Sequence, residues 1–172
     1  MLLNALTIFH VVLSLIGIGA GAVAIYALIQ ARILPGWTKL FLATTMATSI
    51  TGFFFPFHGF TPALALGVMS LIVLLIASLA LYRHRLLGAW RRTYVIAAVI
   101  ALYFNVFVLV VRLFRRVPVL MALAPTQSEP PFQITQVAVL LLFAALGIRA
   151  ATKNAQTLGV SAEQRKRVWR SS

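Results

Sequence analysis

The chain has 172 residues, of which 62% are hydrophobic and 10% are charged, and its mean hydropathy is +0.99. A soluble domain of this length has too small an interior to hide so much apolar surface, so the composition predicts an integral membrane protein. The chain has 15 basic and two acidic residues, an imbalance that in a soluble protein would suggest a nucleic-acid partner. Here the basic residues lie between long apolar runs, so we interpret them as topology signals and predict no nucleic-acid partner.

The residues that most enzymes use are scarce. The chain contains no cysteine, which excludes thiolate catalysis and cysteine metal sites. It contains no aspartate, and of its two acids, Glu129 and Glu163, only Glu129 falls on the predicted outer side, so paired-carboxylate catalysis has no candidates. No nucleophile elbow, phosphate-binding loop or dinucleotide fingerprint occurs. We therefore lean against an enzyme and assign no catalytic residue and no metal site.

Five apolar segments are candidates to cross the hydrocarbon core, which requires about 20 mostly apolar residues per helix. They lie at about 3–29, 40–57, 62–82, 94–113 and 132–148. Because these runs are continuously apolar rather than alternating, helices are favoured over a membrane barrel. The predicted fold class is all-α: an integral membrane bundle of five transmembrane helices over residues 1–151, followed by a basic tail over 152–172.

The distribution of basic residues predicts the orientation. If the N-terminus is outside, twelve basic residues fall on the cytoplasmic side: Arg32, Lys39, Arg83, Arg85, Arg91, Arg92, Arg149, Lys153, Arg165, Lys166, Arg167 and Arg170. Only Arg112, Arg115 and Arg116 then fall outside. The positive-inside rule therefore predicts the N-terminus outside and the C-terminus in the cytoplasm. The basic residues from Arg165 to Arg170 are expected to contact the anionic lipid of the cytoplasmic leaflet.

Polar side chains inside apolar segments mark either helix packing or function, because burying them in lipid is costly. Sorting them by depth places a group of candidate ligand-binding residues in the outer half of the bundle: His10, His58, Asn105, Arg112, Glu129 and Gln136. We predict that they line a polar pocket that opens outward beneath residues 114–131. Within that segment, VPVLMALAP is expected to form a short lid-like helix before a proline-stiffened loop.

Two patterns predict close helix packing. Gly17 and Gly21 form a G-x-x-x-G step in the first span, where small residues let another backbone approach. The partner could be a helix of the same chain or of a second copy, and the sequence leaves both open. Thr44 and Thr48 lie on one face of the second span, where threonine hydroxyls can return to the carbonyls of the preceding turn.

Two histidines raise the question of a cofactor. His10 and His58 belong to different segments on the same predicted side, and two such imidazoles can ligate a b-type haem whose propionates would contact Arg112. The five phenylalanines of FFFPFHGFTP would suit a porphyrin, a quinone or the lipid interface equally well. Hydrogen-bonded structural histidines are the alternative.

Three stretches, GWTKLFLATTMATSITGFFFPFHGFTP, YFNVFVLVVRLFRRVP and LAPTQSEPPF, resemble small polytopic inner-membrane proteins of proteobacteria that have no assigned activity. The resemblance covers most of residues 8–148. It implies a bacterial origin and a place in the inner (cytoplasmic) membrane, but no residue role.

The sequence thus favours a non-enzymatic accessory or structural component, acting in a larger membrane complex or as a homo-oligomer. The first alternative is a haem- or quinone-binding electron-transfer protein that uses His10 and His58. The second is an oligomeric small-solute transporter, although five spans without an inverted repeat offer little material for alternating access.

Overall fold

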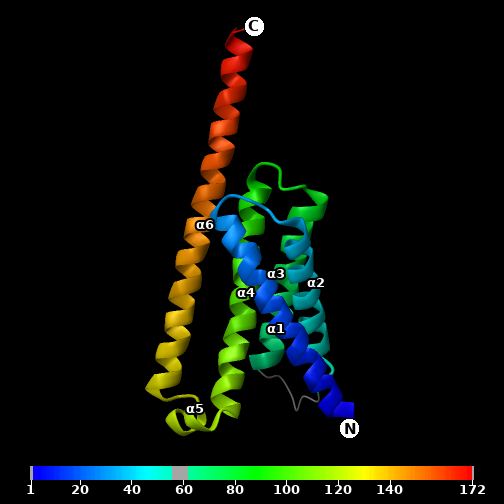
Figure 1. Cartoon of the computed structure of the whole chain (residues 1–172), viewed down its shortest axis with the longest axis vertical. Coiled ribbons are helices and arrows are strands. Elements are labelled where there is room, and N and C mark those ends of the chain that lie inside the picture. Colours follow the sequence, from blue (N-terminus) through cyan, green and yellow to red (C-terminus); the bar gives the residue numbers. More distant parts are fainter. Residues whose placement is uncertain (1, 56–61, 172) are drawn as a thin grey trace.

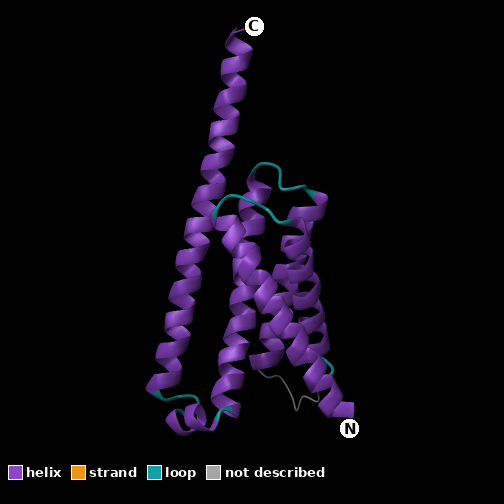
Figure 2. Cartoon of the chain, viewed as in Figure 1, coloured by secondary structure: helices purple, strands orange, loops and turns teal. Residues whose placement is uncertain are grey.

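Helices account for nearly all of the described chain. The computed structural model describes residues 2–55 and 62–171, with side chains over 4–55 and 64–155, and contains no strand within that part (Figure 2). The elements are α1 (Leu2–Ile29), α2 (Pro35–Gly52), α3 (Pro62–Ser78), a π-helical turn η1 (Leu79–Arg83), α4 (Ala89–Arg116), α5 (Pro118–Leu123) and α6 (Pro130–Ser171). The predicted all-α fold class is confirmed for the described residues.

Four of these helices are long and apolar enough to cross a membrane, as the composition predicts. Their span-forming stretches are Asn4–Ile29, Leu64–Arg83, Ala89–Arg116 and Pro130–Ala155. The second predicted span corresponds to α2, which is shorter and carries Lys39 and five threonines, and it is not among the four. The chain is therefore compatible with a membrane protein that has at least four spans.

Successive long helices run in opposite directions (Figure 1). The N-terminus and α5 lie at one end of the bundle, which we call the N-terminal end. The connections over residues 30–34 and 84–88 lie at the opposite end, beyond which α6 projects. We call this second end the basic end, because Arg32, Arg83, Arg85 and Arg92 lie on or beside those connections. The relative placement of the segments matches the predicted alternation, whereas the bundle alone does not define which end faces the cytoplasm.

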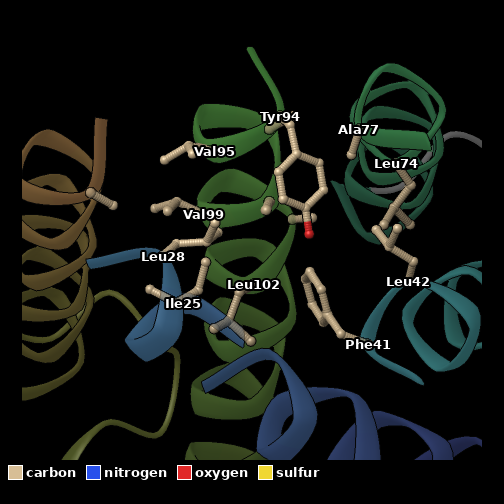
Figure 3. Close-up of a cluster of buried hydrophobic side chains, with 14 of the residues drawn as sticks. Ile25, Leu28, Phe41, Leu42, Leu74, Ala77, Tyr94, Val95, Val99 and Leu102 are labelled. Carbon is tan, nitrogen blue, oxygen red and sulfur yellow. The ribbon is translucent and has the colours of Figure 1, made fainter. Parts of the chain in front are cut away.

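The hydrophobic core is built around α4 (Figure 3). Tyr94, Val95 and Leu102 of α4 are buried against residues of α1, α2 and α3, among them Phe41 and Leu74. Alanines are frequent at these contacts: Ala77 of α3, Ala80 of η1, and Ala98 and Ala101 of α4 are fully buried. Because dispersion and close packing, rather than exclusion of water, associate helices in lipid, such small residues suit a membrane bundle.

Gly17 and Gly21 both face helices of the same chain. A Cβ at Gly21 would lie 2.7 Å from Leu102 Cδ1 on α4 and 2.8 Å from Phe41 Cδ2 on α2. A Cβ at Gly17 would lie 3.1 Å from the Thr45 hydroxyl. By contrast, a Cβ at Gly19 would meet nothing within 4 Å. The G-x-x-x-G step therefore lets α1 lie close to α2 and α4.

The last helix is longer than the predicted fifth span. That span was placed at 132–148, but α6 begins at Pro130 and continues without a break to Ser171. Polar Asn154, which the sequence analysis places in the basic tail, is fully buried against the end of α1. The residues that look like the start of the tail thus belong to the bundle.

Candidate functional site

Two cavities meet at His10 and Arg112. The smaller, of about 140 Å³, lies between α2, α3 and α4 and is lined by Thr48, Ser49 and Phe55 as well as by those two residues. The larger, of about 660 Å³, is a cleft between α1 and α4 at the N-terminal end. We call this larger cavity the α1/α4 cleft. Its polar lining residues are Asn4, Thr7, His10, Ser14, Arg112 and Arg116.

His10 is held by a hydrogen bond to α2. Its Nδ1 lies 3.0 Å from the hydroxyl of Thr51, which in turn donates to the carbonyl of Ala47 at 2.8 Å. Since a hydroxyl has one proton, Thr51 accepts from Nδ1–H in this arrangement. The neutral imidazole then has an unprotonated Nε2, the nitrogen that can accept a hydrogen bond or ligate a metal. Phe55 packs edge-on against the ring, with centroids 5.3 Å apart.

Arg112 is half-buried and has no acidic neighbour among the described residues. Its guanidinium carbon lies 6.0 Å from the centroid of the Phe55 ring, at the outer limit of a cation–π contact. The one acid with a described side chain, Glu129, is hydrogen-bonded to Thr126 and Ser128 instead. A half-buried cation without a counter-ion in an apolar bundle is costly, which marks Arg112 as the strongest functional candidate in the cleft.

Asn105 lies on α4 about two turns before Arg112, and it is buried and does not line the cleft. It accepts a hydrogen bond from the Ser14 hydroxyl at 3.2 Å and donates to the Thr45 hydroxyl at 3.5 Å. A Cβ added to Gly17 would lie 3.3 Å from its amide nitrogen, so the absence of a side chain there leaves room for this network. Asn105 therefore ties α1, α2 and α4 together and reaches the cleft only through Ser14.

The threonines of α2 bond mainly within their own helix. Thr44 donates to the Leu40 carbonyl at 2.7 Å, and Thr48 donates to the Thr44 carbonyl at 2.8 Å. These bonds satisfy the hydroxyls inside an apolar bundle, as the i−4 pattern predicts. Thr48 also lines the smaller cavity, whereas Thr44 packs toward Gly17.

The structure places Gln136 and Glu129 away from both cavities. The Gln136 amide donates to the Phe107 carbonyl at 3.3 Å, across the contact between α6 and α4, and its buried Oε1 has no hydrogen-bond partner in the described chain. Glu129 lies in the loop that precedes α6. The five candidate residues with described side chains therefore do not form one pocket: His10 and Arg112 line the cleft, Asn105 is adjacent, and Glu129 and Gln136 lie elsewhere.

The predicted lid does not cover the cleft. A short helix does form where the apolar segment predicts one, as α5, but it packs against α4, and no described residue of it lines either cavity. At this end of the molecule, α5 lies between the ends of α4 and α6 (Figure 1). The segment thus closes the α4–α6 connection rather than the α1/α4 cleft.

Asn4, Thr7 and Ser14 were missed by the sequence analysis. With His10 they are spaced by three or four residues along α1, which puts them on one helix face. That spacing of polar residues in an apolar helix was the available signal. His58 lies outside the described residues, and the side chains from Arg165 to Arg170 do as well, so their predicted roles stay predictions.

Among the residues that the structure describes, no group of three or more histidines, cysteines and acids is placed to hold a metal ion. Comparison with protein-family models, curated proteins and solved structures finds no match to this chain.

Proposed function

We propose that the chain is a five-span, non-enzymatic protein of a bacterial inner membrane, with its N-terminus outside and its C-terminus in the cytoplasm. The antiparallel order of the helices and the excess of basic residues at one end support this orientation. For α2, eighteen residues correspond to about 27 Å of helix, close to the thickness of the hydrocarbon core. Its threonine hydroxyls are largely satisfied within the helix, and Lys39 lies near the basic end.

We further propose that the α1/α4 cleft binds the anionic group of an amphipathic small molecule. The observation that carries this proposal is Arg112, half-buried between two cavities with no acidic partner in the described chain. A carboxylate or phosphate would supply the missing counter-charge, and guanidinium donors match such groups bidentately. Arg116, one turn further along α4, lines the same cleft and adds to its positive potential.

The other lining residues fit an amphipathic ligand. His10 and Ser14 offer hydrogen-bonding groups on the α1 side, while Ile8, Val11 and Leu109 offer apolar contacts. A volume of about 660 Å³ falls in the usual range of roughly 300–1,000 Å³ for small-molecule pockets. No acid lines the cleft, and the Ser14 hydroxyl donates to Asn105 rather than to His10, so binding is a better match to these residues than catalysis.

A binding measurement with a charged and an uncharged probe tests the proposal. Purified protein is titrated with a fluorescent long-chain carboxylate and with its methyl ester. The wild type should bind the carboxylate at least several-fold more tightly than the ester, and Arg112→Gln should bind both alike. Arg115→Gln is the matched control, because Arg115 is exposed, contacts Gln127 and lines neither cavity. Preference for the carboxylate that persists in Arg112→Gln would refute the role of Arg112.

One observation favours the haem-binding alternative as a second candidate. The hydrogen bond of His10 to Thr51 leaves Nε2 unprotonated, which is the tautomer that ligates iron. The second axial ligand would be His58. Protein purified from haem-replete cells should then show a Soret band that is lost in His10→Ala, and a colourless protein would exclude this candidate.

A place in a larger complex remains our proposal for the cellular role, and mild-detergent electrophoresis tests it. The chain should co-migrate with larger partners, and migration at the size of the single chain would count against the idea. Transport by an oligomer is weaker, because five spans offer little material for alternating access and contact with a second copy through Gly17 and Gly21 would have been needed to offset that objection. Both glycines face α2 and α4 of the same chain.

A further inference from the structure

A third cavity, an apolar groove, follows the contact between α4 and α6. Its volume is about 380 Å³, and the α4 side is formed by Ile96, Ile100 and Tyr103, while Leu140, Ala144 and Ile148 line the α6 side. The polar side chains of its lining are confined to Arg92 and Thr152 at one end and the Tyr103 ring at the other. The groove is separate from the α1/α4 cleft, with which it shares no lining residue.

The length of the groove corresponds to one leaflet of a bilayer. Its α4 lining runs from Arg92 to Tyr103, and its α6 lining runs antiparallel from Thr152 to Leu140. Eleven residue steps of helix cover about 17 Å, a little over half of the roughly 30 Å hydrocarbon core. Arg92 stands in the first turn of α4, at the basic end, so it lies where lipid headgroups would be.

The side chain of Arg92 is available for a ligand. It is exposed and makes no hydrogen bond or ion pair with the described residues, whereas its neighbour Arg91 is engaged by Asn154 and the Ala31 carbonyl. Thr152 donates its hydroxyl to the Ile148 and Arg149 carbonyls, which leaves Arg92 as the charged group at the mouth. A free guanidinium above an apolar channel is complementary to a phosphate that carries an acyl chain.

We propose that this groove binds one acyl chain of an anionic phospholipid, whose phosphate pairs with Arg92. A second copy of the chain is a poorer occupant, because Arg92 would then need an acidic partner. The single acid with a described side chain, Glu129, lies near the opposite end of the bundle. Lipid supplies both the apolar chain and the negative charge, and the proposal does not depend on what the α1/α4 cleft binds.

Gly147 provides a way to close the groove without altering its charge. It lies in the α6 wall, and a Cβ there would contact Val99 Cγ1 at 3.3 Å, so a larger side chain must turn into the groove or push the helices apart. Gly147→Leu is therefore expected to reduce acyl-chain binding, while Arg92→Gln should remove only the preference for anionic headgroups.

Native mass spectrometry of the full chain, titrated with phosphatidylglycerol or phosphatidylcholine, tests the proposal. The wild type should retain phosphatidylglycerol at least several-fold more than phosphatidylcholine, and Arg92→Gln should retain the two lipids equally. The matched control is Arg83→Gln, since Arg83 is exposed at the same end but does not line the groove. Equal retention by the wild type, or the same loss in Arg83→Gln as in Arg92→Gln, would overturn the proposal. If Gly147→Leu fails to fold, the comparison of the two lipids in Arg92→Gln still tests the proposal.

Discussion

The guanidinium of Arg91 donates a 2.7 Å hydrogen bond from Nε to the side-chain carbonyl of Asn154, which joins the start of α4 to a fully buried position on α6. A second donor, Nη2, reaches the Ala31 carbonyl at 2.6 Å. The Asn154 amide donates to the Leu28 carbonyl at 2.7 Å. Carbonyls in the last turn of a helix lack the usual i+4 donor, and here side chains from α4 and α6 donate to the Ala31 carbonyl just beyond α1 and to the Leu28 carbonyl in its last turn.

We expect Asn154→Leu to destabilise the bundle. The substitution leaves the half-buried Arg91 Nε–H without its acceptor and removes one of the two donors to the Leu28 carbonyl, which keeps the Ala31 N–H, at a cost of about 2 kcal/mol in the free energy of unfolding. Arg92→Gln, one residue from Arg91, has no hydrogen bond to lose and should change stability little. Unfolding of both variants in mixed micelles, followed by circular dichroism, measures the difference. Equal stability of Asn154→Leu and wild type would show that this network contributes nothing.

The glycines of α1 provide a second matched pair. In Gly21→Ala the new methyl would lie 2.7 Å from Leu102 and 2.8 Å from Phe41, so the packed side chains must shift, at a cost of about 1–3 kcal/mol. In Gly19→Ala the methyl meets nothing within 4 Å, and the higher helix propensity of alanine should stabilise by up to about 1 kcal/mol. The same unfolding assay compares them. A destabilised Gly19→Ala with an unaffected Gly21→Ala would mean that the packing face of α1 is assigned wrongly.

The helices could be predicted from sequence because hydropathy over about 20 residues is a local signal. The segments corresponding to α1, α3 and α4 are largely as expected, and so is the short helix α5 after Pro118. Helix α6 continues past the predicted end of the fifth span, where Asn154 looks like a tail residue until its partners are known. Those partners, Leu28 and Arg91, are 126 and 63 residues away in sequence.

The candidate site was predicted only in part, because sequence shows the depth of a residue along its helix but not the direction of its side chain. Depth along a helix can be counted from sequence, and it correctly put His10 and Arg112 at the same end of the bundle. The direction in which a side chain points around its helix axis depends on which neighbour the helix packs against. Gln136 therefore shares a predicted depth with Arg112 but contacts Phe107 on the α6 side of α4.

The loop before α6 should respond to acid through Glu129. Partial desolvation raises the pKa of this carboxyl, but hydrogen bonds from Thr126 and from the backbone at 126, 128 and 129 lower it by more, so the pKa lies below the ordinary 4.5. Since the pKa is lower in the folded state, the stabilisation is complete above 4.5 and is lost as pH falls through the folded value.

The pKa of Glu129 can be read from the carboxyl resonance of ¹³C-labelled glutamate. Glu163→Gln leaves Glu129 as the only glutamate in the chain, so its titration is unambiguous. We expect a midpoint below 4.5, and Thr126→Val should raise it by removing the 2.9 Å bond from the hydroxyl. A midpoint at or above 4.5 in the Glu163→Gln protein would contradict the hydrogen-bonded loop.

Membrane sidedness can be tested with single cysteines, because the chain has none of its own. Leu87 and Ser128 are exposed in the connections beyond opposite ends of α4. On intact cells, a membrane-impermeant thiol reagent should modify Ser128→Cys but reach Leu87→Cys only after permeabilisation. Reaction of both in detergent is the control for accessibility. The reverse pattern would place the basic end outside, against the positive-inside rule.

Arg32→Cys and Phe54→Cys extend the same test to α2, the helix whose passage across the bilayer is least determined by its composition. Arg32 and Phe54 are exposed just beyond the two ends of α2. If α2 crosses the membrane, the reagent should modify Phe54→Cys from outside and Arg32→Cys only from the cytoplasm. Modification of both from one side would reduce the spans to four. If α2 did not cross, α1 and α3 would be consecutive spans and would have to run in opposite directions, whereas both run from the N-terminal end to the basic end (Figure 1). The close contact of Gly21 with Phe41 makes that arrangement hard to reconcile with the packing, so we expect the two cysteines to react from opposite sides.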